Sequence, residues 1–485
     1  MTEVDKRIEM VQTILDTPHG ELDRLFELHK QFVEVDPLFY SKFAIYYGKT
    51  GSIRDHKKIF ASHVLTGSMI EVRELGEFLL TDLTPYDVVE TVDLILKFRG
   101  SGGKKRRLNK VIKKYLRDFE RDAKNGNSFR FLKNANALRK MYQRLHVKPS
   151  EEASASLGFR DGDPGKKYES FLDMEKLTTL KEESEICQMI SESQIPALQI
   201  FGALPVKITP AIAASMISKM SPQEIQNFAG MLQKQGLFED PEFKKLFKQK
   251  VKKGGAKMSM RGTSAKKSLG KDSDIMDEAT DSFVESLPTI KRKIGLYIDR
   301  SNSMTQAIAM GKDIASILAS KVENPEENLF IVAFNSTCQK IPVPTEKKYS
   351  EFELTFRFMN ANGTTSLGAP IKFTYENGFE PETFIFITDG KETDVPLLDN
   401  ILKSTPKLAH TKMIFCKVGK DATDVKVSTQ KDLGLEIENL DFRKGDYYGL
   451  PNLLNLISKG GIRDLIQEID NIDLFEEIRK RREAA

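Results

Sequence analysis

The fold of the C-terminal half is decided by the stretch Gly295-Leu296-Tyr297-Ile298-Asp299-Arg300-Ser301-Asn302-Ser303-Met304. A short apolar run ends there in an acid, and a turn rich in hydroxyl groups follows at once. Further short apolar runs lie at 329–334, 384–388 and 413–418, and amphipathic stretches lie at 305–321, 367–376 and 395–403. Apolar runs that alternate with helical stretches indicate a doubly wound α/β domain with a mostly parallel sheet. We expect this domain to span residues 290–460.

Polar side chains follow two of these predicted strands. Asp299 begins an Asp-x-Ser-x-Ser pattern with Ser301 and Ser303, and Asp389 comes directly after the run 384–388. Thr364 adds a hydroxyl group on a glycine turn before another helical stretch. The carboxyl ends of parallel strands meet at one edge, where open α/β sheets bind ligands. Two carboxylates and three hydroxyl groups suit hard cations, so these five residues are predicted to hold Mg²⁺ or Mn²⁺.

In this order, the three pieces resemble the metal-ion-dependent adhesion site of von Willebrand factor A domains. The resemblance implies that the serines bind the metal directly, and that the acids bind it directly or through water. The ligand set itself leaves room for waters and for one outside carboxylate or phosphate oxygen. Arg300 departs from the pattern, since relatives often carry a small or apolar residue there. Alternatively, Asp299 and Asp389 only cap the turns that follow them.

Residues 1–253 are expected to be helical almost throughout, because apolar residues recur there at spacings of three and four. Helix starts are indicated by a capping residue before a proline at 36–37, 84–85, 209–210, 221–222 and 240–241. Many short helices joined by short loops predict a HEAT-like array of stacked helical pairs, with an irregular helical domain as the alternative. We expect a basic linker over 254–289 and a C-terminal helix within 461–485 that packs back on one of the domains.

The formal net charge of +4 conceals two basic segments. Residues 100–150 hold 16 Lys or Arg against 3 Asp or Glu, and residues 243–271 hold 11 Lys or Arg and no acid. The local net charges of +13 and +11 leave −20 for the other 405 residues. Such concentrated positive charge on an acidic chain indicates a polyanion as partner.

The first basic segment ends in Arg144-Leu145-His146-Val147-Lys148-Pro149-Ser150. This resembles the Arg-Leu-x-His-x-Lys-Pro-Ser stretch of the Ro 60 kDa autoantigen family (the TROVE module), with one residue missing between Leu145 and His146. Residues 103–111 resemble the basic helix of that family. The resemblance implies that the helical repeats close into a ring. It further implies that Y-type noncoding RNA binds the outer surface and that single-stranded 3′ ends of misfolded RNAs enter the hole.

The candidate RNA contacts are the cations of this segment and one histidine: Lys104, Lys105, Arg106, Arg107, Lys110, Lys113, Lys114, Arg139, Lys140, Arg144, His146 and Lys148. Cationic side chains of this kind bind phosphates without regard to sequence. Phe129, Phe131 and Tyr142 lie among them and could stack on unpaired bases. For Phe131 and Tyr142, a place in the hydrophobic core is the favoured alternative.

Two functions remain open at this stage. The first is a ribonucleoprotein component that binds noncoding RNA, as a monomer, with an A domain that recruits a protein through its metal. The second is a metal-dependent adaptor without specific RNA binding. The sequence contains no Gly-x-x-x-x-Gly-Lys-Ser/Thr loop, so we expect no enzyme of the nucleotide-hydrolysing kind. A metal-dependent nuclease is disfavoured, because the hydroxyl-rich shell adds no charge to hold a second ion. Three distant cysteines, no membrane span and no apolar leader fit a cytoplasmic protein.

Overall fold

The computed structural model describes residues 3–16, 22–51, 53–67, 69–99, 103–252, 284–285, 287–408, 411–428, 434–442, 453–454, 457 and 462–484. They form two compact units. The helical unit contains the described residues within 22–48, 54–279 and 473–485. The sheet unit contains those within 1–21, 49–53 and 280–472. Most of the predicted basic linker, including residues 254–271, lies outside the described residues.

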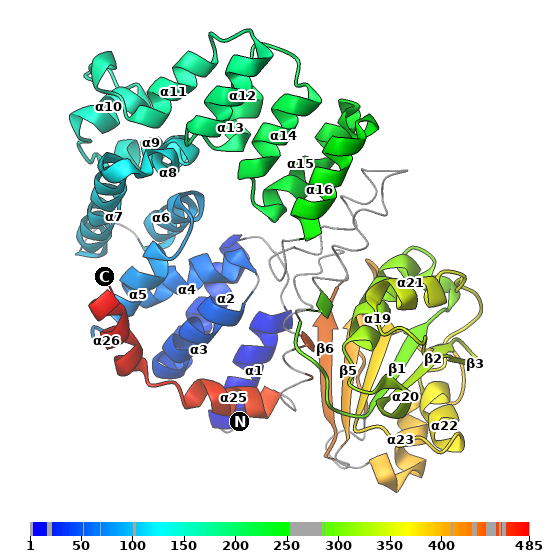
Figure 1. Ribbon diagram of the computed structural model, residues 1–485. Coiled ribbons are helices and arrows are strands. Elements are labelled where there is room, and N and C mark those ends of the chain that lie inside the picture. The colour runs from blue at the N-terminus through cyan, green and yellow to red at the C-terminus, as the bar shows by residue number, and fades with distance from the viewer. Residues whose placement is uncertain are drawn as a thin grey trace. The chain divides into compact units, whose positions relative to one another are not determined.

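The first part of the helical unit is built from α2 (Leu22–Val35), α3 (Pro37–Thr50), α4 (Arg54–Thr66), α5 (Arg73–Thr81), α6 (Pro85–Arg99), α7 (Gly103–Asp122), α8 (Ser128–Lys133) and α9 (Ala135–Leu145). The second part contains α10 (Glu151–Leu157), α11 (Glu169–Leu177), α12 (Glu183–Glu192), α13 (Ala197–Ala203), α14 (Pro210–Lys219), α15 (Pro222–Lys234) and α16 (Pro241–Lys252). Short helical turns η1 (Ala123–Asn127), η2 (Pro164–Lys166) and η3 (Leu237–Glu239) join some of them. Figure 1 labels the α-helices of both parts. The prediction of a helical-repeat array is confirmed.

Local sequence explains where several of these helices begin. All five predicted prolines occupy a first helical position, in α3, α6, α14, α15 and α16. The missing N–H of proline costs nothing there, because the first turn has no acceptor for it. Before α15, the Ser221 hydroxyl accepts from the Glu224 N–H, and the Glu224 carboxylate accepts from the Ser221 N–H, which forms a capping box.

Helices close in sequence pack together in the helical unit. Within its first part, α4 packs against α2, α5 and α6, and within its second part α14 packs against α12, α13 and α16. Large aromatic side chains such as Phe26, Tyr40, Phe43 and Phe60 are almost fully buried between the first helices. Such contacts between sequential helices are typical of stacked repeats. Closure of the array into a ring stays a prediction from the resemblance.

The sheet unit contains a six-stranded sheet in the order β3-β2-β1-β4-β5-β6. The strands are β1 (Ile294–Asp299), β2 (Leu329–Phe334), β3 (Cys338–Ile341), β4 (Thr383–Thr388), β5 (Lys412–Lys417) and β6 (Glu436–Asp441). Only β3 is antiparallel to its neighbour. The doubly wound, mostly parallel sheet is therefore confirmed, and β3 and β6 are additional edge strands that the sequence analysis does not predict.

Helices cover both faces of this sheet. α19 (Ile308–Ser320) packs on β1 and β4, where Gly311 approaches Ile387. α22 (Gly368–Glu376) packs on β2 and against α23 (Leu398–Ser404), and its Ile371 belongs to the same core cluster as Tyr297 and Phe386. Phe386 packs on the side of α22, and the next residue, Ile387, packs on the side of α19. Because successive residues of a strand point to opposite faces, the two helices lie on opposite faces of the sheet. α20 (Pro325–Asn328), α21 (Tyr349–Phe356) and η7 (Pro406–Leu408) complete this part of the unit.

The two ends of the chain do not follow the predicted domain boundaries. α1 (Glu3–Asp16), which the predicted domain 1–253 includes, belongs to the sheet unit and packs against β6 and α25 (Ile462–Asp470). Arg7 of α1 forms an ion pair of 2.8 Å with Asp470 of α25. The predicted C-terminal helix consists of α25 and a second helix, α26 (Leu474–Ala484), which packs on α5 in the helical unit. Among the described helices, none is long and apolar enough to cross a membrane.

Candidate metal centre and basic surface

The candidate metal residues lie where the strand order of the sheet reverses. β1 and β4 are adjacent and parallel, and Ile298 is in register with Ile387. Asp299 at the end of β1 and Asp389 just after β4 therefore emerge at the same edge. After β1 the chain continues to β2 on one side of β1, whereas β4 lies on the other side of β1. This reversal is the place where ligands bind in open α/β sheets.

Asp299 is fully buried and is held by two donors. The Ser301 N–H donates to its Oδ1 at 2.8 Å, and the Thr388 hydroxyl donates to its Oδ2 at 2.6 Å. Burial raises the pKa of the Asp299 carboxyl to about 6, the hydrogen bonds from Thr388 and Ser301 oppose this shift, and the nearby Asp389 adds to it. A desolvated carboxylate beside a second carboxylate gains stability when a cation is bound next to both.

The serines of the pattern present their hydroxyl groups together. Ser301 is buried and precedes η6 (Asn302–Met304), whereas Ser303 within this turn is exposed. Their Oγ atoms lie 3.0 Å apart. Two hydroxyl oxygens at this separation can both contact one small cation, as hard oxygen ligands do.

Backbone hydrogen bonds bring the second motif beside the first. The Asn302 N–H donates to Gly363 O at 3.0 Å, and the Asn362 N–H donates to Arg300 O at 2.6 Å. Gly363 has a φ of +78°, and a Cβ there would lie 2.8 Å from Asn335 Nδ2, so this turn requires glycine. The turn thus holds Thr364 next to the Asp-x-Ser-x-Ser segment.

The Thr364 hydroxyl is exposed and already has a partner. It donates to Asp394 Oδ2 at 2.7 Å. This hydrogen bond and one from the Val395 N–H lower the pKa of the Asp394 carboxyl. Thr364 would have to turn from Asp394 toward the metal to serve as a ligand. The sequence analysis missed Asp394, because the acid lies 30 residues away and only folding brings it to Thr364.

Asp389 completes the candidate site. It is buried, and its Oδ1 accepts a hydrogen bond of 3.2 Å from the Lys391 N–H. Lys391 Nζ lies 4.0 Å from Asp389 Oδ2, so a cation at this carboxylate would compete with the lysine. The other missed residue is Thr388, which positions Asp299. The sequence signal that could have identified Thr388 is a hydroxyl residue directly before an acid at the end of a predicted strand.

The donor set fits a hard divalent cation. It offers the carboxylates of Asp299 and Asp389 and the hydroxyls of Ser301 and Ser303, with Thr364 within the same loop cluster. The described residues contain no group of three or more His, Cys, Asp or Glu side chains arranged to hold a metal. Arg300 Nε is buried without a hydrogen-bond partner among the described residues.

The basic residues of the first segment form a continuous surface along α7. The exposed cations Arg106, Lys110, Lys113, Lys114, Arg117 and Arg121, here termed the α7 stripe, recur at helical spacing. The opposite face is apolar and buries Leu108, Ile112 and Leu116 completely. Lys104 and Lys105 lie in the first turn of α7, but their side chains lie outside the described residues.

Four cations of the α7 stripe are free to meet an anion. Within the described part of the chain, Arg106, Lys110, Lys113 and Lys114 form no ion pair. Arg117 and Arg121 instead pair with acids of their own helix, Glu120 at 2.5 Å and Asp118 at 2.9 Å. Arg107 lies off the stripe, half-buried, and pairs with Glu77 at 2.7 Å.

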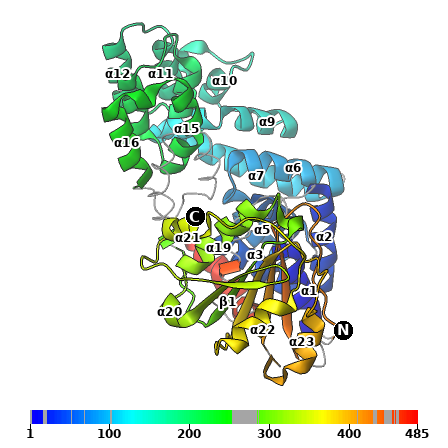
Figure 2. The same cartoon turned by 90° about the vertical axis from the view of Figure 1, so that its right-hand side faces the viewer.

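The remaining candidates lie within α9 and directly after it, and α9 contacts α6 and α7 (Figure 2). Arg139, Lys140, Arg144, His146 and Lys148 are all exposed. Arg144 pairs with Asp93, and Arg139 donates to Leu157 O. His146 ends α9 in the left-handed conformation, with a φ of 51°.

A buried acid of α7, Glu120, connects the α7 stripe with α9 and the residues that follow it. Glu120 Oε1 accepts from the Tyr142 hydroxyl at 2.7 Å and from the Ser150 N–H at 2.9 Å. Its other oxygen pairs with Arg117, which also donates to Lys148 O at 3.0 Å. The sequence analysis missed Glu120, since one acid among sixteen cations carries no local signal for a buried role.

Two of the three aromatic candidates belong to the core. Phe131 and Tyr142 are 0% and 2% exposed, so neither ring can stack on a base from solvent. The sequence analysis favoured this core position for both residues. Phe129 is half-buried, and of the named rings only that of His146 is exposed.

Comparison with known proteins relates this chain to others by structure. Family profiles give no match, and curated protein sequences give none either. The crystal structure of the Ro (RSR) protein of Deinococcus radiodurans matches with a TM-score of 0.61 and 13% identity, over 90% of this chain and 93% of that chain. A von Willebrand factor type A structure from Catenulispora acidiphila matches 36% of the chain with 12% identity and a TM-score of 0.27. The fold of helical repeats followed by an α/β domain, which the resemblance implied, is thus found in a solved Ro protein.

Proposed function

We propose that the protein binds RNA through the helical unit, as a noncoding-RNA-binding component of a ribonucleoprotein. The α7 stripe carries the proposal, because it offers several exposed cations that no acid of the described residues neutralises. Phosphates bound by such cations release counterions, which drives association without regard to sequence. The shared fold with a Ro protein supports this reading over other polyanions.

The finer parts of the proposal rest on the resemblance. Y-like RNA would bind the basic surface, and misfolded RNAs with single-stranded 3′ ends would be a second class of ligand. We further propose that the protein acts as a monomer in the cytoplasm and performs no catalysis.

Charge reversal on the α7 stripe tests RNA binding. Lys110→Glu, Lys113→Glu and Lys114→Glu, combined in one variant, should weaken binding of a structured RNA by at least about tenfold, because three phosphate contacts become repulsive. The matched control reverses three exposed lysines elsewhere in the helical unit: Lys181, Lys207 and Lys234. Equal affinity of both variants in an electrophoretic mobility shift assay would rule out the stripe as the interface.

A second proposal concerns the sheet unit. Buried Asp299 and Asp389 at the strand-order reversal support a Mg²⁺ or Mn²⁺ site there, and a bound cation would supply an open position for a carboxylate of a protein partner. In the alternative function, the protein is a metal-dependent adaptor without specific RNA binding. Its basic surface would then meet acidic proteins.

Calorimetric titration with Mn²⁺ tests the metal site. Asp299→Ala should abolish saturable binding, whereas Glu382→Ala should leave it unchanged, because Glu382 precedes β4 at the opposite edge of the sheet. Absence of saturable binding to the unaltered protein would contradict the metal proposal. Metal-dependent capture of a protein partner, free of RNA, by a chain that fails the RNA assay would favour the adaptor.

A further inference from the structure

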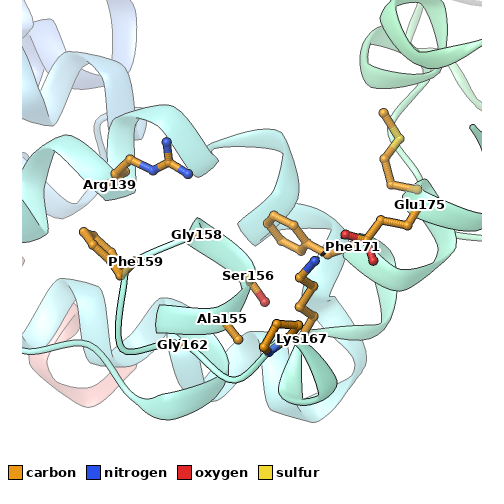
Figure 3. A pocket seen from close by; sticks show the side chains of 11 residues that line it. Arg139, Ala155, Ser156, Gly158, Phe159, Gly162, Lys167, Phe171 and Glu175 are labelled. Carbon is orange, nitrogen blue, oxygen red and sulfur yellow. Dashed lines mark hydrogen bonds and ion pairs between the residues drawn. The ribbon is translucent and has the colours of Figure 1, made fainter.

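The helical unit contains a pocket that neither the metal site nor the α7 stripe includes. It lies between α9, α10, the loop around η2, and α11 (Figure 3). Its volume is about 450 Å³, which lies within the range of about 300–1,000 Å³ typical of small-molecule sites. Its side chains combine aromatic rings with cations.

Two phenylalanine rings supply the apolar surface of the pocket. Figure 3 shows Phe159 and Phe171 on either side of Ser156. Each ring packs edge-on against a ring of the core. Phe159 lies 6.3 Å from Tyr142, and Phe171 lies 6.3 Å from Phe131, between ring centroids. These contacts with buried rings restrict the movement of both pocket rings.

The polar lining carries a net positive charge. Arg139 and Lys167 are cationic, and Glu175 is the one acid among the lining residues. Arg139 uses a single N–H group on Leu157 O, which leaves other donors of its guanidinium for a ligand. Lys167 pairs with Glu175, so an incoming anion would compete with this acid for the lysine.

The pocket shares one residue with the candidate RNA contacts of α9. Arg139 belongs to both, and Lys140 and Arg144 follow it as exposed residues of α9. A strand bound by these cations would therefore have Arg139, which lines the pocket, as one of its contacts. The adjoining turn is held tightly, because a Cβ on Gly162 would lie 2.6 Å from the backbone of Ala155.

We propose that this pocket takes one unpaired nucleotide, with its base against Phe159 or Phe171 and its phosphate on Arg139 and Lys167. Bases stack on aromatic side chains regardless of sequence, and cations next to the ring bind the adjoining phosphate. This inference rests on the proposed RNA-binding function and adds a subsite for a base that leaves the stack.

A single-tryptophan variant provides the test, because the chain contains no tryptophan. Uridine monophosphate and a five-nucleotide oligouridylate should quench the fluorescence of the Phe171→Trp protein saturably. Phe159→Trp serves as the second reporter if the first does not fold. Phe358→Trp is the control, since this residue is 84% exposed, belongs to the sheet unit and does not line the pocket.

Two charge variants separate binding from a structural role. In the reporter background, Lys167→Ala should weaken nucleotide binding at least about fivefold, because it removes a charge-assisted contact to the phosphate. Glu175→Gln should leave binding unchanged or tighten it, because it frees the lysine. If both variants weaken binding equally, the ion pair only supports the fold and the proposal is wrong.

The remaining outcomes distinguish this proposal from the proposed function. No quenching by either nucleotide ligand, while structured RNA still binds, overturns the pocket and leaves RNA binding intact. Competition by inorganic phosphate as effective as that by uridine monophosphate overturns the base-binding part. Saturable quenching without binding of structured RNA supports the pocket and contradicts the proposed function.

Discussion

At the scale of single residues, the candidate metal site depends on groups that position its ligands. Asp299 is fixed by Thr388 and by the Ser301 N–H, whereas Asp394 holds Thr364 in an orientation that it would have to leave to become a ligand. None of these contacts involves a metal directly. They decide which oxygen atoms face the site, as outer hydrogen bonds do in metal centres.

The Thr388 hydroxyl provides a first prediction. Thr388→Val keeps the shape of the side chain but removes the hydrogen bond to Asp299 Oδ2, so Mn²⁺ affinity should fall by about tenfold or more. Thr411→Val is the control, because the Thr411 hydroxyl donates to Leu408 O in the same unit. Calorimetric titration measures both variants. Equal affinities would show that Thr388 does not position a ligand.

A buried histidine provides a second prediction, about pH. His29 lies fully buried between Tyr40 and His56, at 2.8 and 2.9 Å, and burial together with His56 and His63 lowers its pKa well below the usual value. The unfolded chain takes up a proton at this residue near pH 6.5, whereas the folded chain does not. Its contribution to stability is therefore complete above about pH 6.5 and is lost as pH falls below it.

Thermal melts between pH 7 and pH 5 measure this effect. The melting temperature of the helical unit should decrease as the pH is lowered from 7 to 5. His29→Gln should make this decrease smaller, because glutamine takes up no proton. An unchanged slope in the variant would mean that His29 does not titrate between the folded and unfolded states.

At the scale of elements, Glu120 connects α7 to the segment after α9. Glu120→Ala leaves the Tyr142 hydroxyl and the Ser150 N–H without their acceptor and should cost about 2–3 kcal/mol of stability. Glu152→Ala is the control, since its 2.9 Å pair with Lys124 is partly exposed and should contribute less than about 1 kcal/mol. Chemical denaturation compares the two, and similar losses would contradict a special role for Glu120.

Sequence patterns within single helices and strands were sufficient to predict the fold. The contacts between these elements could not be predicted from such patterns. Proline after a capping residue marked the starts of five helices, and apolar runs ending in Asp299 and at Asp389 marked the central strands. These signals are local, because they depend on backbone geometry and on one buried face. The partners of Glu120, Thr364 and Arg7 come from distant segments, so only the folded chain identifies them. The edge strand β6, with acids at Glu436 and Glu438, also lacks the apolar run of a central strand.

At the scale of the molecule, each end of the chain packs in the unit that sequence order does not suggest. α1 packs with the sheet unit and α26 with the helical unit, where Arg482 pairs with Glu74 of α5 and Arg481 pairs with Asp82 directly after α5. Three residues separate α25 from α26, so the chain passes from one unit to the other within a short loop. Periodicity along the chain carries no information about this exchange.

Core substitutions in the last two helices should therefore act on different units. Ile478→Ala in α26 should cost about 2–4 kcal/mol and increase hydrogen exchange in α5. Ile469→Ala in α25 should increase exchange in α1 instead, since both residues are buried but in different units. Exchange measured by mass spectrometry distinguishes them, and the same exchange pattern for both variants would contradict the division into two units.

The most direct test of the central claim is the salt dependence of RNA binding by the whole protein. We would measure affinity for a structured RNA, with and without a single-stranded 3′ tail, from low to high salt, for the unaltered chain and the variant reversed at Lys110, Lys113 and Lys114. The account predicts a steep slope, tighter binding of the tailed RNA, and a slope smaller by about three in the variant. A shallow slope that the variant does not change would contradict RNA binding by the α7 stripe.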